Sequence, residues 1–428
     1  MAYPKIRGLR WWIMSILMLG SIVNYLTRST LSNAAPTILP ALHITTEQYA
    51  WILNFFQFTI MLQPLAGFVL DTLGLKVGFA IFAFAWSLIS MAHGLAGSWQ
   101  SFAWLRGFLG LAEGSSNPAG MKATAEWFPA KERGFAGGLF NIGASVGSML
   151  APPLVGFAIL YYNWQSAFVI TGAVGLVWAT LWLWFYHAPA KHPRLSDEER
   201  AYIAAGQEKH LQGDGTRPSA WKIMRQRNFW GIALPRFLAD PTWSTLTFWL
   251  PLYLSTVRHF NLKEIALTAW LPFLAADLGC MSGGVIVAFL QKRGVGLIDA
   301  RRGAFTVGAG LMTCMAAVGF VESPSVAVAL LCLGGFAHQT LSVTVITMSS
   351  DLFKRNEVAT VAGLAGTCGN AGVLVFNTLI GVLVVRIGYT PFFLGLGVLD
   401  LVGAVVLWTL VRKPNADDRT PRPSANAA

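Results

Sequence analysis

Apolar runs of roughly 18 or more residues recur from one end of this chain to the other, and they limit what the chain can fold into. Each run is long enough to cross about 30 Å of hydrocarbon as a helix. Composition agrees, because 54% of the residues are hydrophobic and 12% are charged, whereas a soluble protein carries about 25% charged residues. Strand-length segments of alternating polarity are absent. The sequence therefore predicts an all-α membrane protein with many helical spans.

We expect twelve transmembrane helices in two six-helix bundles. The first bundle covers residues 1–187, a cytoplasmic linker 188–227, the second bundle 228–413 and a disordered cytoplasmic tail 414–428. In the linker, Ser196 followed by three acidic residues is typical of a helix N-terminus and predicts an amphipathic helix. The expected spans are 11–33, 49–70, 77–97, 101–122, 135–158, 166–187, 229–254, 265–290, 303–321, 325–349, 358–385 and 389–411.

The positive charge lies mostly on one side of this predicted topology. The formal net charge is +11, with 31 Lys and Arg. Outside the spans, the side opposite the termini holds only Arg258, Lys263 and Arg386. Cytoplasmic loops carry such an excess of Lys and Arg, so both termini are expected in the cytoplasm of a multi-pass protein surrounded by lipid. This asymmetry explains the charge without a nucleic-acid partner.

The two halves of the chain also repeat. A shift of 225 residues without a gap places residues 126–139 on 351–364, and it aligns Gly147 with Gly372. The same shift places Glu113 on His338. A repeat offset of six spans keeps the topology parallel, as in transporters whose solute site lies at mid-membrane between two halves.

The stretch Trp104–Gly120 is Gly-rich and apolar but carries Arg106 and Glu113. Seven residues of helix place these two side chains on one face, about 10 Å apart along the axis. Charges at this depth are costly and usually face a cavity or one another. We therefore expect a solute pathway here, with Glu113 as the proton carrier and Arg106 beside it. The alternative is a structural ion pair that only joins helices.

Span 1 contains N-Y-L-T-R, which places Arg28 near the expected level of Arg106. Two arginines without adjacent carboxylates favour an organic anion, since each guanidinium presents a planar fork to a carboxylate. Tyr25, one turn earlier, could donate to sugar hydroxyls. The alternative is that Arg28 snorkels to the outer interface.

Span 7 carries Arg236 and Asp240 at i,i+4 spacing together with two prolines that weaken the helix. We interpret it as a broken helix that binds solute, with Trp243 as a platform for a sugar face. A structural ion pair is the alternative. His338 and Gln339 in span 10 are expected to face the cavity. Of the other buried acids, Asp277 and Asp400, the second is expected in an outer helix with a structural role.

Several amide side chains within spans are candidate readers of solute hydroxyls, and each of them is equally suited to join helices. Asp71 ends span 2 and could latch onto the neighbouring half as a gating residue. The candidate amides are Asn54, Gln57, Asn141, Asn370 and Asn377.

Motifs of other activities are missing from the sequence. It has no Walker motif, no Gly-rich nucleotide loop and no H-E-x-x-H site. Its four cysteines lie inside apolar runs without C-x-x-C spacing, as expected of packing residues. We expect a secondary transporter rather than an enzyme, with neither cofactor nor metal.

Six motifs resemble the anion:cation symporter branch of the major facilitator superfamily, most closely its bacterial hexuronate transporters. The similarity covers almost the whole chain and implies proton-coupled uptake of galacturonate or glucuronate across the inner membrane. We expect the protein to be a monomer. The motifs are N-Y-L-T-R-S-T (24–30) with A-A-P (34–36), R-G-x-x-G-x-x-E (106–113), E-W-F-P-A-K-E-R (126–133), W-G-I-A-L-P-R-F-L-A (230–239), G-G-F-A-H-Q (334–339) and S-S-D-L-F-K-R-N-E-V-A-T (349–360).

By this resemblance Arg28 and Tyr25 match substrate residues of span 1, Glu113 the proton-linked glutamate, Arg106 the arginine of span 4, and Asn370 a sugar-contacting asparagine. Two positions depart from the family. Thr27 stands where many relatives have an aspartate, which leaves the proton stoichiometry open, and Thr59 stands where many have a tyrosine. A transporter of another sugar acid, such as an aldonate, and a non-transporting sugar-acid sensor are the rival interpretations.

Overall fold

The computed structural model describes residues 4–129, 132–205, 219–353 and 357–412. Every regular element in this part of the chain is a helix. The first part contains α1 (Leu9–Ala41), α2 (Thr46–Ile60), α3 (Gln63–Leu73), α4 (Leu75–Ala92), η1 (His93–Leu95), α5 (Trp99–Glu113), α6 (Ser116–Trp127), α7 (Arg133–Tyr161), α8 (Trp164–Phe185), η2 (Pro189–Lys191) and α9 (Asp197–Ala205). The second contains α10 (Ala220–Met224), α11 (Arg227–Ser244), η4 (Thr245–Trp249), α12 (Leu250–Thr256), α13 (Leu262–Thr268), α14 (Leu271–Lys292), α15 (Leu297–Met312), η5 (Thr313–Ala317), α16 (Pro324–Leu352), α17 (Val358–Ile387) and α18 (Thr390–Leu410).

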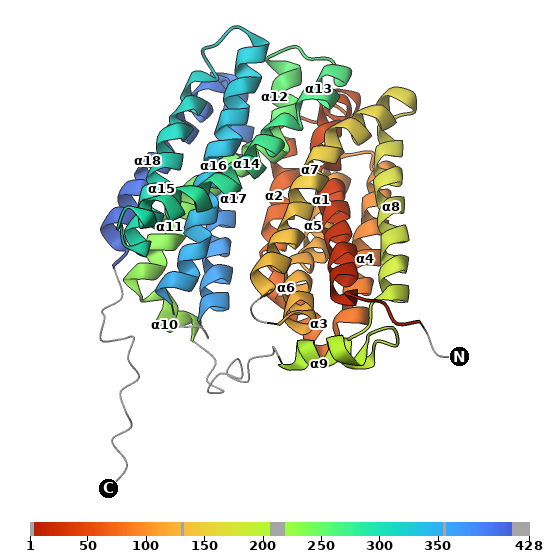
Figure 1. The fold of residues 1–428 in the computed structure, drawn as a ribbon. Helices are drawn as coiled ribbons and strands as arrows, with labels where there is room; N and C mark the ends of the chain where they lie inside the picture. The colour runs from red at the N-terminus through yellow and green to blue at the C-terminus, as the bar shows by residue number, and fades with distance from the viewer. Residues whose placement is uncertain (1–3, 130–131, 206–218, 354–356, 413–428) are drawn as a thin grey trace.

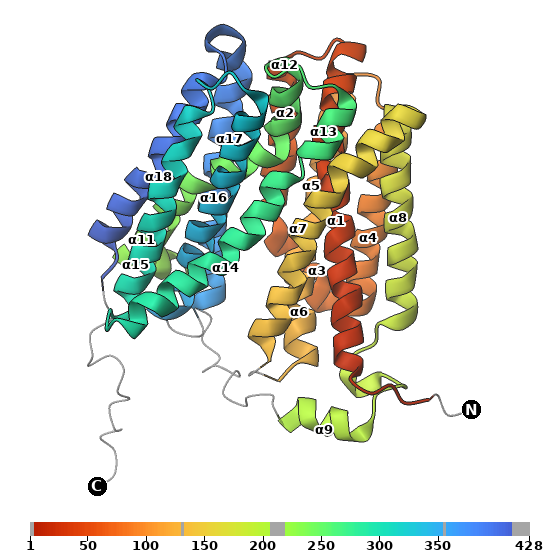
Figure 2. The same ribbon diagram turned by 45° about the horizontal axis from the view of Figure 1, so that its top comes forward.

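The helices form two groups that stand side by side (Figure 1). We call α1–α8 the N-terminal bundle and α11–α18 the C-terminal bundle. The two bundles contact each other through α2 with α17, α1 with α12, and α7 with α13 and α14. Both views show them close together at the end where α12 and α13 lie, and farther apart at the end where α9 lies (Figure 2). These are called the α12 end and the α9 end below.

The expected twelve helical spans are confirmed, although several are not single straight helices. Within the described residues, eight helices are long and apolar enough to cross a membrane, or nine if the pair α2 and α3, bent by 43°, counts as one. The other three expected spans are each divided: α5 from α6, α11 from α12 by η4, and α15 from η5. Polar residues or short breaks interrupt these three spans, and membrane bundles tolerate such breaks where the backbone is buried in protein or lines a cavity.

Equivalent glycines support the internal repeat. Gly147 on α7 packs against the backbone of Ile22 on α1, and Gly372 on α17 packs against the backbone of Phe237 on α11. Neither position has room for a Cβ atom without displacing a backbone carbonyl. The repeat therefore places the same close helix pair in both bundles, α1 with α7 and α11 with α17.

The linker helix α9 is bonded to the N-terminal bundle. Ser196 Oγ accepts a hydrogen bond from the backbone of Glu199 at 3.2 Å, as expected of an N-cap. Arg10 pairs with Glu199 at 2.7 Å and with Glu132 at 3.1 Å, and Tyr202 donates to Glu132 at 2.5 Å. Residues 206–218 of the expected linker and the expected tail, 414–428, lie outside the described residues.

Candidate functional site

Three charged side chains meet where α1 packs near α5. Arg28 Nε donates to Glu113 Oε2 at 3.0 Å, and Arg106 Nη2 donates to the backbone carbonyl of Arg28 at 2.9 Å. Arg106 and Glu113 are each only 1% exposed. The structure thus places Arg28 and Arg106 next to each other and also brings Glu113 to Arg28, a contact that the sequence did not predict.

One expectation about these residues is wrong. The sequence suggests two arginines without adjacent carboxylates, but Arg28 forms an ion pair with Glu113. The two residues are 85 positions apart, and only the packing of α1 near α5 brings them into contact. The Arg28 side chain keeps 14% exposure, whereas that of Glu113 has none. Of this pair, the guanidinium is therefore the group that solvent or a solute can reach.

Polar groups of α1 complete the surroundings of the pair. Asn24 Oδ1 accepts from Arg28 Nη2 at 3.2 Å, and Thr27 Oγ1 lies 2.9 Å from Glu113 Oε1. Residues at i, i+3 and i+4 share one helix face, so these side chains converge. Sequence reasoning noted Thr27 only as a departure from the family and did not include Asn24. Their helical spacing to Arg28 was the available signal.

Aromatic rings lie beside both guanidinium groups. Arg28 Cζ is 4.4 Å from the ring centre of Tyr25, and Arg106 Cζ is 5.1 Å from that of Phe56. A cation within about 6 Å of a ring centre is attracted to it, more strongly when water is excluded. Phe56 can lie here because Gly110 lets α5 approach α2: a Cβ atom there would be 2.6 Å from the carbonyl oxygen of Phe56.

A second ion pair lies in the C-terminal bundle. Arg236 Nη2 and Asp240 Oδ2 are 3.2 Å apart, and each side chain is 18% exposed. The expected break at the prolines is absent, since α11 continues through Pro235 and Pro241 to Ser244. The irregular part follows as the π-helical turn η4. Carbonyls freed by a proline can be satisfied by neighbours within a membrane bundle, so the helix need not end there.

Trp243 and His338 stack on each other, with ring centres 5.9 Å apart and an interplanar angle of 19°. His338 is 2% exposed. One face of the expected sugar platform is thus covered by a side chain of α16, and Phe273 meets the Trp243 ring edge-on. Gln339, next to His338, is half-buried.

The candidate amides are spread over different surroundings. Gln57 Nε2 donates to Asn370 Oδ1 at 2.6 Å, and Asn54 Nδ2 donates to Thr378 Oγ1 at 2.8 Å. Both bonds join α2 of one bundle to α17 of the other. Asn141 is exposed on α7. The structure therefore places Gln57 and Asn370 at the contact between the bundles, close to each other, and Asn141 apart from them.

Two further candidates have partners within their own bundle. Asp71 pairs with Lys122 of α6 at 2.6 Å, rather than with a residue of the C-terminal bundle. Asn377 Oδ1 accepts from Ser244 at 3.0 Å and from Trp249 Nε1 at 2.9 Å. Asn377 thus joins α17 to the end of α11 and to η4.

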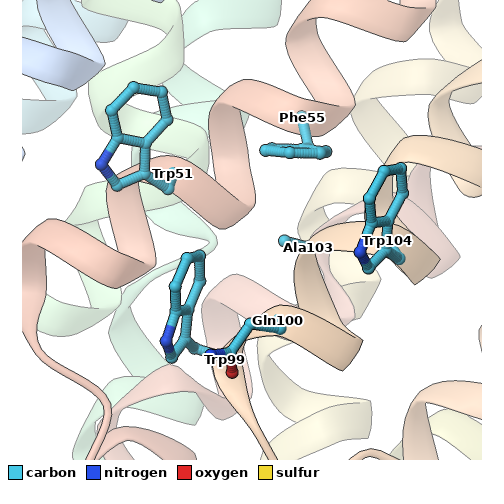
Figure 3. Close-up of a pocket in the computed structure, with 6 residues that line it drawn as sticks. All are labelled: Trp51, Phe55, Trp99, Gln100, Ala103 and Trp104. Atoms are coloured by element: carbon cyan, nitrogen blue, oxygen red, sulfur yellow. The ribbon is translucent and has the colours of Figure 1, made fainter.

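An aromatic pocket lies on α2 and α5, away from the charged site. Its volume is about 190 Å³, and its lining carries no charged side chain. Trp51 and Trp104 are 47% and 62% exposed, so this face of the bundle is open to its surroundings. Figure 3 shows the lining residues Trp51, Phe55, Trp99, Gln100, Ala103 and Trp104.

Comparisons with known proteins agree with this architecture. The chain is 49% identical to the hexuronate transporter of Escherichia coli (strain K12) over 416 residues, covering 96% of each chain. It is 51% identical over 329 residues to the galacturonate transporter of Dickeya chrysanthemi, covering 76% of this chain and 95% of that one. It is 26% identical to the D-galactonate transporter of Escherichia coli O6:H1, covering 94% and 95%.

Solved structures share the fold. A D-xylose-proton symporter superposes with a TM-score of 0.72 at 14% identity, covering 94% of this chain and 98% of that one. A bacterial homologue of the lysosomal transporter Spinster, in an inward-facing conformation, superposes with a TM-score of 0.69 at 16% identity, covering 94% and 95%. The Major Facilitator Superfamily model matches residues 17–298 and 295–428. This chain is a multi-pass membrane protein and belongs to the major facilitator superfamily.

Proposed function

We propose that this protein is a symporter that imports a hexuronate, galacturonate or glucuronate, together with a proton. The observation that carries the proposal is the ion pair between Arg28 and the enclosed carboxylate of Glu113, 3.0 Å apart. The relatives named as hexuronate and galacturonate transporters, at 49% and 51% identity, support the substrate class.

The pair couples the two solutes by competition. A sugar carboxylate that binds the exposed part of Arg28 takes the counter-ion away from Glu113. A buried carboxylate without a counter-ion is costly, so Glu113 then binds a proton. When the sugar leaves, Arg28 returns to Glu113 and the proton is released. Arg236, from the other bundle, adds a second cation for the carboxylate, and Tyr25, Gln57 and Asn370 supply groups for the hydroxyls.

The arrangement of the two bundles supports transport by alternating access. They lie close together at the α12 end and farther apart at the α9 end (Figure 1), and Asn54 bonds to Thr378 across the contact between them. We infer that the α9 end faces the cytoplasm of the inner membrane, since most Lys and Arg outside the spans lie on that side. The conformation that is open at the α12 end requires the contacts between α2 and α17 to break.

Proteoliposome uptake of labelled galacturonate under an imposed pH gradient tests the proposal. Wild-type protein is expected to accumulate the sugar against its gradient. Glu113→Gln, which mimics the protonated carboxyl, should still exchange labelled for unlabelled sugar but should not accumulate it. Glu322→Gln, at an exposed carboxylate, is the matched control and should behave as wild type. Accumulation by Glu113→Gln would contradict the coupling role.

Competition between sugar acids in the uptake assay tests which of them the protein prefers. Galacturonate, glucuronate and galactonate are added in excess to wild-type uptake, and the uronates are expected to compete best. Preferential competition by galactonate would assign the chain to aldonate transport, as in the relative at 26% identity. Binding without any uptake or exchange would instead favour a sensor.

A further inference from the structure

Thr27 lies beside the proton-carrying group of the proposed cycle. Its side chain is on α1, one residue before Arg28, and it is 1% exposed. Three acceptors surround its hydroxyl: Oγ1 is 2.9 Å from Glu113 Oε1, 2.9 Å from the carbonyl oxygen of Asn24 and 3.2 Å from that of Val23. A hydroxyl has one hydrogen to donate but can also accept. It can therefore serve only one of these acceptors well at a time.

The two protonation states of Glu113 need opposite partners. An ionised carboxylate only accepts hydrogen bonds, and here it accepts from Arg28 Nε and from the Thr27 hydroxyl. A protonated carboxyl must donate its hydrogen, and an enclosed donor without an acceptor is costly. Thr27 Oγ1, at 2.9 Å, is within reach as that acceptor.

A single rotation of the Thr27 hydroxyl satisfies both states. When Glu113 is ionised, the hydroxyl hydrogen points to Glu113. When Glu113 gains a proton, Glu113 donates to Thr27 Oγ1, and the hydroxyl hydrogen turns to the carbonyl of Asn24. No heavy atom has to move. Apolar side chains of the same size offer neither partner.

We propose that Thr27 is a positioning residue for proton coupling, whose reversible hydroxyl keeps Glu113 bonded in both protonation states and sets the pH at which it exchanges its proton. This inference rests on the proposed function, because it assigns the partner of the carboxyl that carries the proton. The charged groups that act on Glu113 are Arg28 from α1 and Arg106 from its own helix. Both are retained when Thr27 is changed.

Removal of the hydroxyl should favour the protonated form. A hydrogen bond to a charged group is about twice as strong as one between neutral groups. Thr27→Val, which keeps the shape of the side chain, therefore costs the ionised carboxylate more than it costs the neutral acid. The pH at which Glu113 loses its proton should rise by about one unit.

Sugar exchange in proteoliposomes, with the same pH on both sides, measures this shift. Exchange needs the loaded, protonated carrier, so its rate falls at high pH. We call the part of the pH–rate curve in which the exchange rate decreases the falling limb. For Thr27→Val the falling limb should lie about one unit higher in pH than for wild type. For Thr27→Ser it should lie at the wild-type pH. Thr30→Val is the matched control, because Thr30 is buried one turn away and donates to Leu26 at 2.9 Å. Its falling limb should stay in place. Thr27→Ala replaces Thr27→Val if the latter does not fold.

The outcomes separate this inference from the proposed function. In Glu113→Gln the exchange rate should be independent of pH, and adding Thr27→Val should leave it so. If Glu113→Gln keeps the wild-type falling limb, proton coupling through Glu113 is wrong and this inference fails with it. If Glu113→Gln is flat but Thr27→Val falls at the wild-type pH, or Thr27→Ser shifts as far as Thr27→Val, only the role of Thr27 is overturned.

Discussion

Asp400 is a carboxyl group enclosed in the middle of α18. Its exposure is 0%, and within the described residues neither of its oxygens has a hydrogen-bond partner. Gly403, one turn away, faces Phe305 and Pro235. Burying an ionised carboxylate in such surroundings costs several kcal/mol, so we expect this group to be buried in its neutral form. The 225-residue offset places Gly175 opposite Asp400, so the repeat itself does not require an acid there.

Asp400→Asn is therefore expected to preserve stability or to increase it. Wild-type protein must take a proton from solution to bury this group, and the amide removes that requirement. The melting temperature of the purified variant at pH 8 should equal or exceed that of wild type, with a smaller difference at pH 6. Glu322→Gln should show no such pH dependence. A loss of more than about 1 kcal/mol at pH 8 would mean that the Asp400 carboxylate has an ionic partner.

For single residues, the sequence predicted which charged side chains lie within the spans but not how these side chains pair. Charges within apolar runs identified Arg28, Arg106 and Glu113, because such charges are costly in lipid. The Arg28–Glu113 pair and the role of Thr27 depend on how α1 is rotated against α5. The spacing of residues along one helix does not predict how that helix is rotated relative to its neighbour.

Close helix packing depends on glycine at matching places in the two bundles. Gly372→Ala should separate α17 from α11, because the added Cβ atom would meet the carbonyl of Phe237, and backbone cannot move aside as a flexible side chain can. We expect a loss of about 1–3 kcal/mol in stability, measured by thermal or denaturant unfolding in detergent.

Gly363→Ala, in the same helix, is the control for this substitution. No atom lies within 4 Å of a Cβ placed there, so the helix should gain slightly from the better helix former. Equal effects of the two substitutions would contradict the packing explanation.

The presence of the helices was predictable from the apolar runs of the sequence. The continuity of α11 through Pro235 and Pro241 was not, since it depends on neighbouring helices.

The segment between α8 and α9 contains a buried histidine whose neutral form is fixed by its bonds. His192 Nδ1 accepts from the backbone of Arg194, and Nε2 lies 3.2 Å from the carbonyl of Phe185. Burial lowers the pKa of His192 to about 4. In the unfolded chain the ring has its ordinary pKa of about 6.5, so between these values the unfolded segment binds more protons. The stability of this segment should therefore fall as the pH drops from about 6.5 toward 4.

His192→Asn tests this pH dependence, because its side-chain oxygen can replace Nδ1 as the acceptor. Between pH 7 and pH 5 the wild-type segment should lose about 1–2 kcal/mol of protection in hydrogen exchange of α9. The variant should lose less. An equal loss in both proteins would show that other groups cause the dependence.

For the whole molecule, the proposed alternating-access cycle requires the contacts near the α12 end to break. Asn54 and Thr378, from different bundles, are joined by a bond of 2.8 Å. With Cys280, Cys314, Cys332 and Cys368 replaced by serine, Asn54→Cys with Thr378→Cys can be joined by a short reducible thiol linker. Joining the two should reduce galacturonate uptake to background, and reduction should restore it. The single-cysteine variants should be insensitive, and undiminished uptake after linking would contradict this movement.

The two-bundle architecture was predictable because the repeat and the apolar runs are properties of the sequence itself. Which end of the molecule is closed was not predictable from the sequence. The two conformations of the proposed cycle share one sequence and differ in free energy by only a few kcal/mol. Asn54 and Gln57 illustrate this. Their residue type suited hydroxyl binding and helix joining equally, and in this conformation both bond to α17.

Because the short helices α9 and α10 are attached to different bundles, the distance between them reports on the relative movement of the two bundles. The helix α9 is bonded to the N-terminal bundle through Glu199 and Arg10, whereas α10 packs against α11 and α17. A fluorophore at the exposed position Ala204 would move with the N-terminal bundle, and one at the exposed position Lys222 would move with the C-terminal bundle. Energy transfer between them should rise if the α9 end closes as the proposed cycle requires, so single molecules could be followed without altering the proposed sugar site.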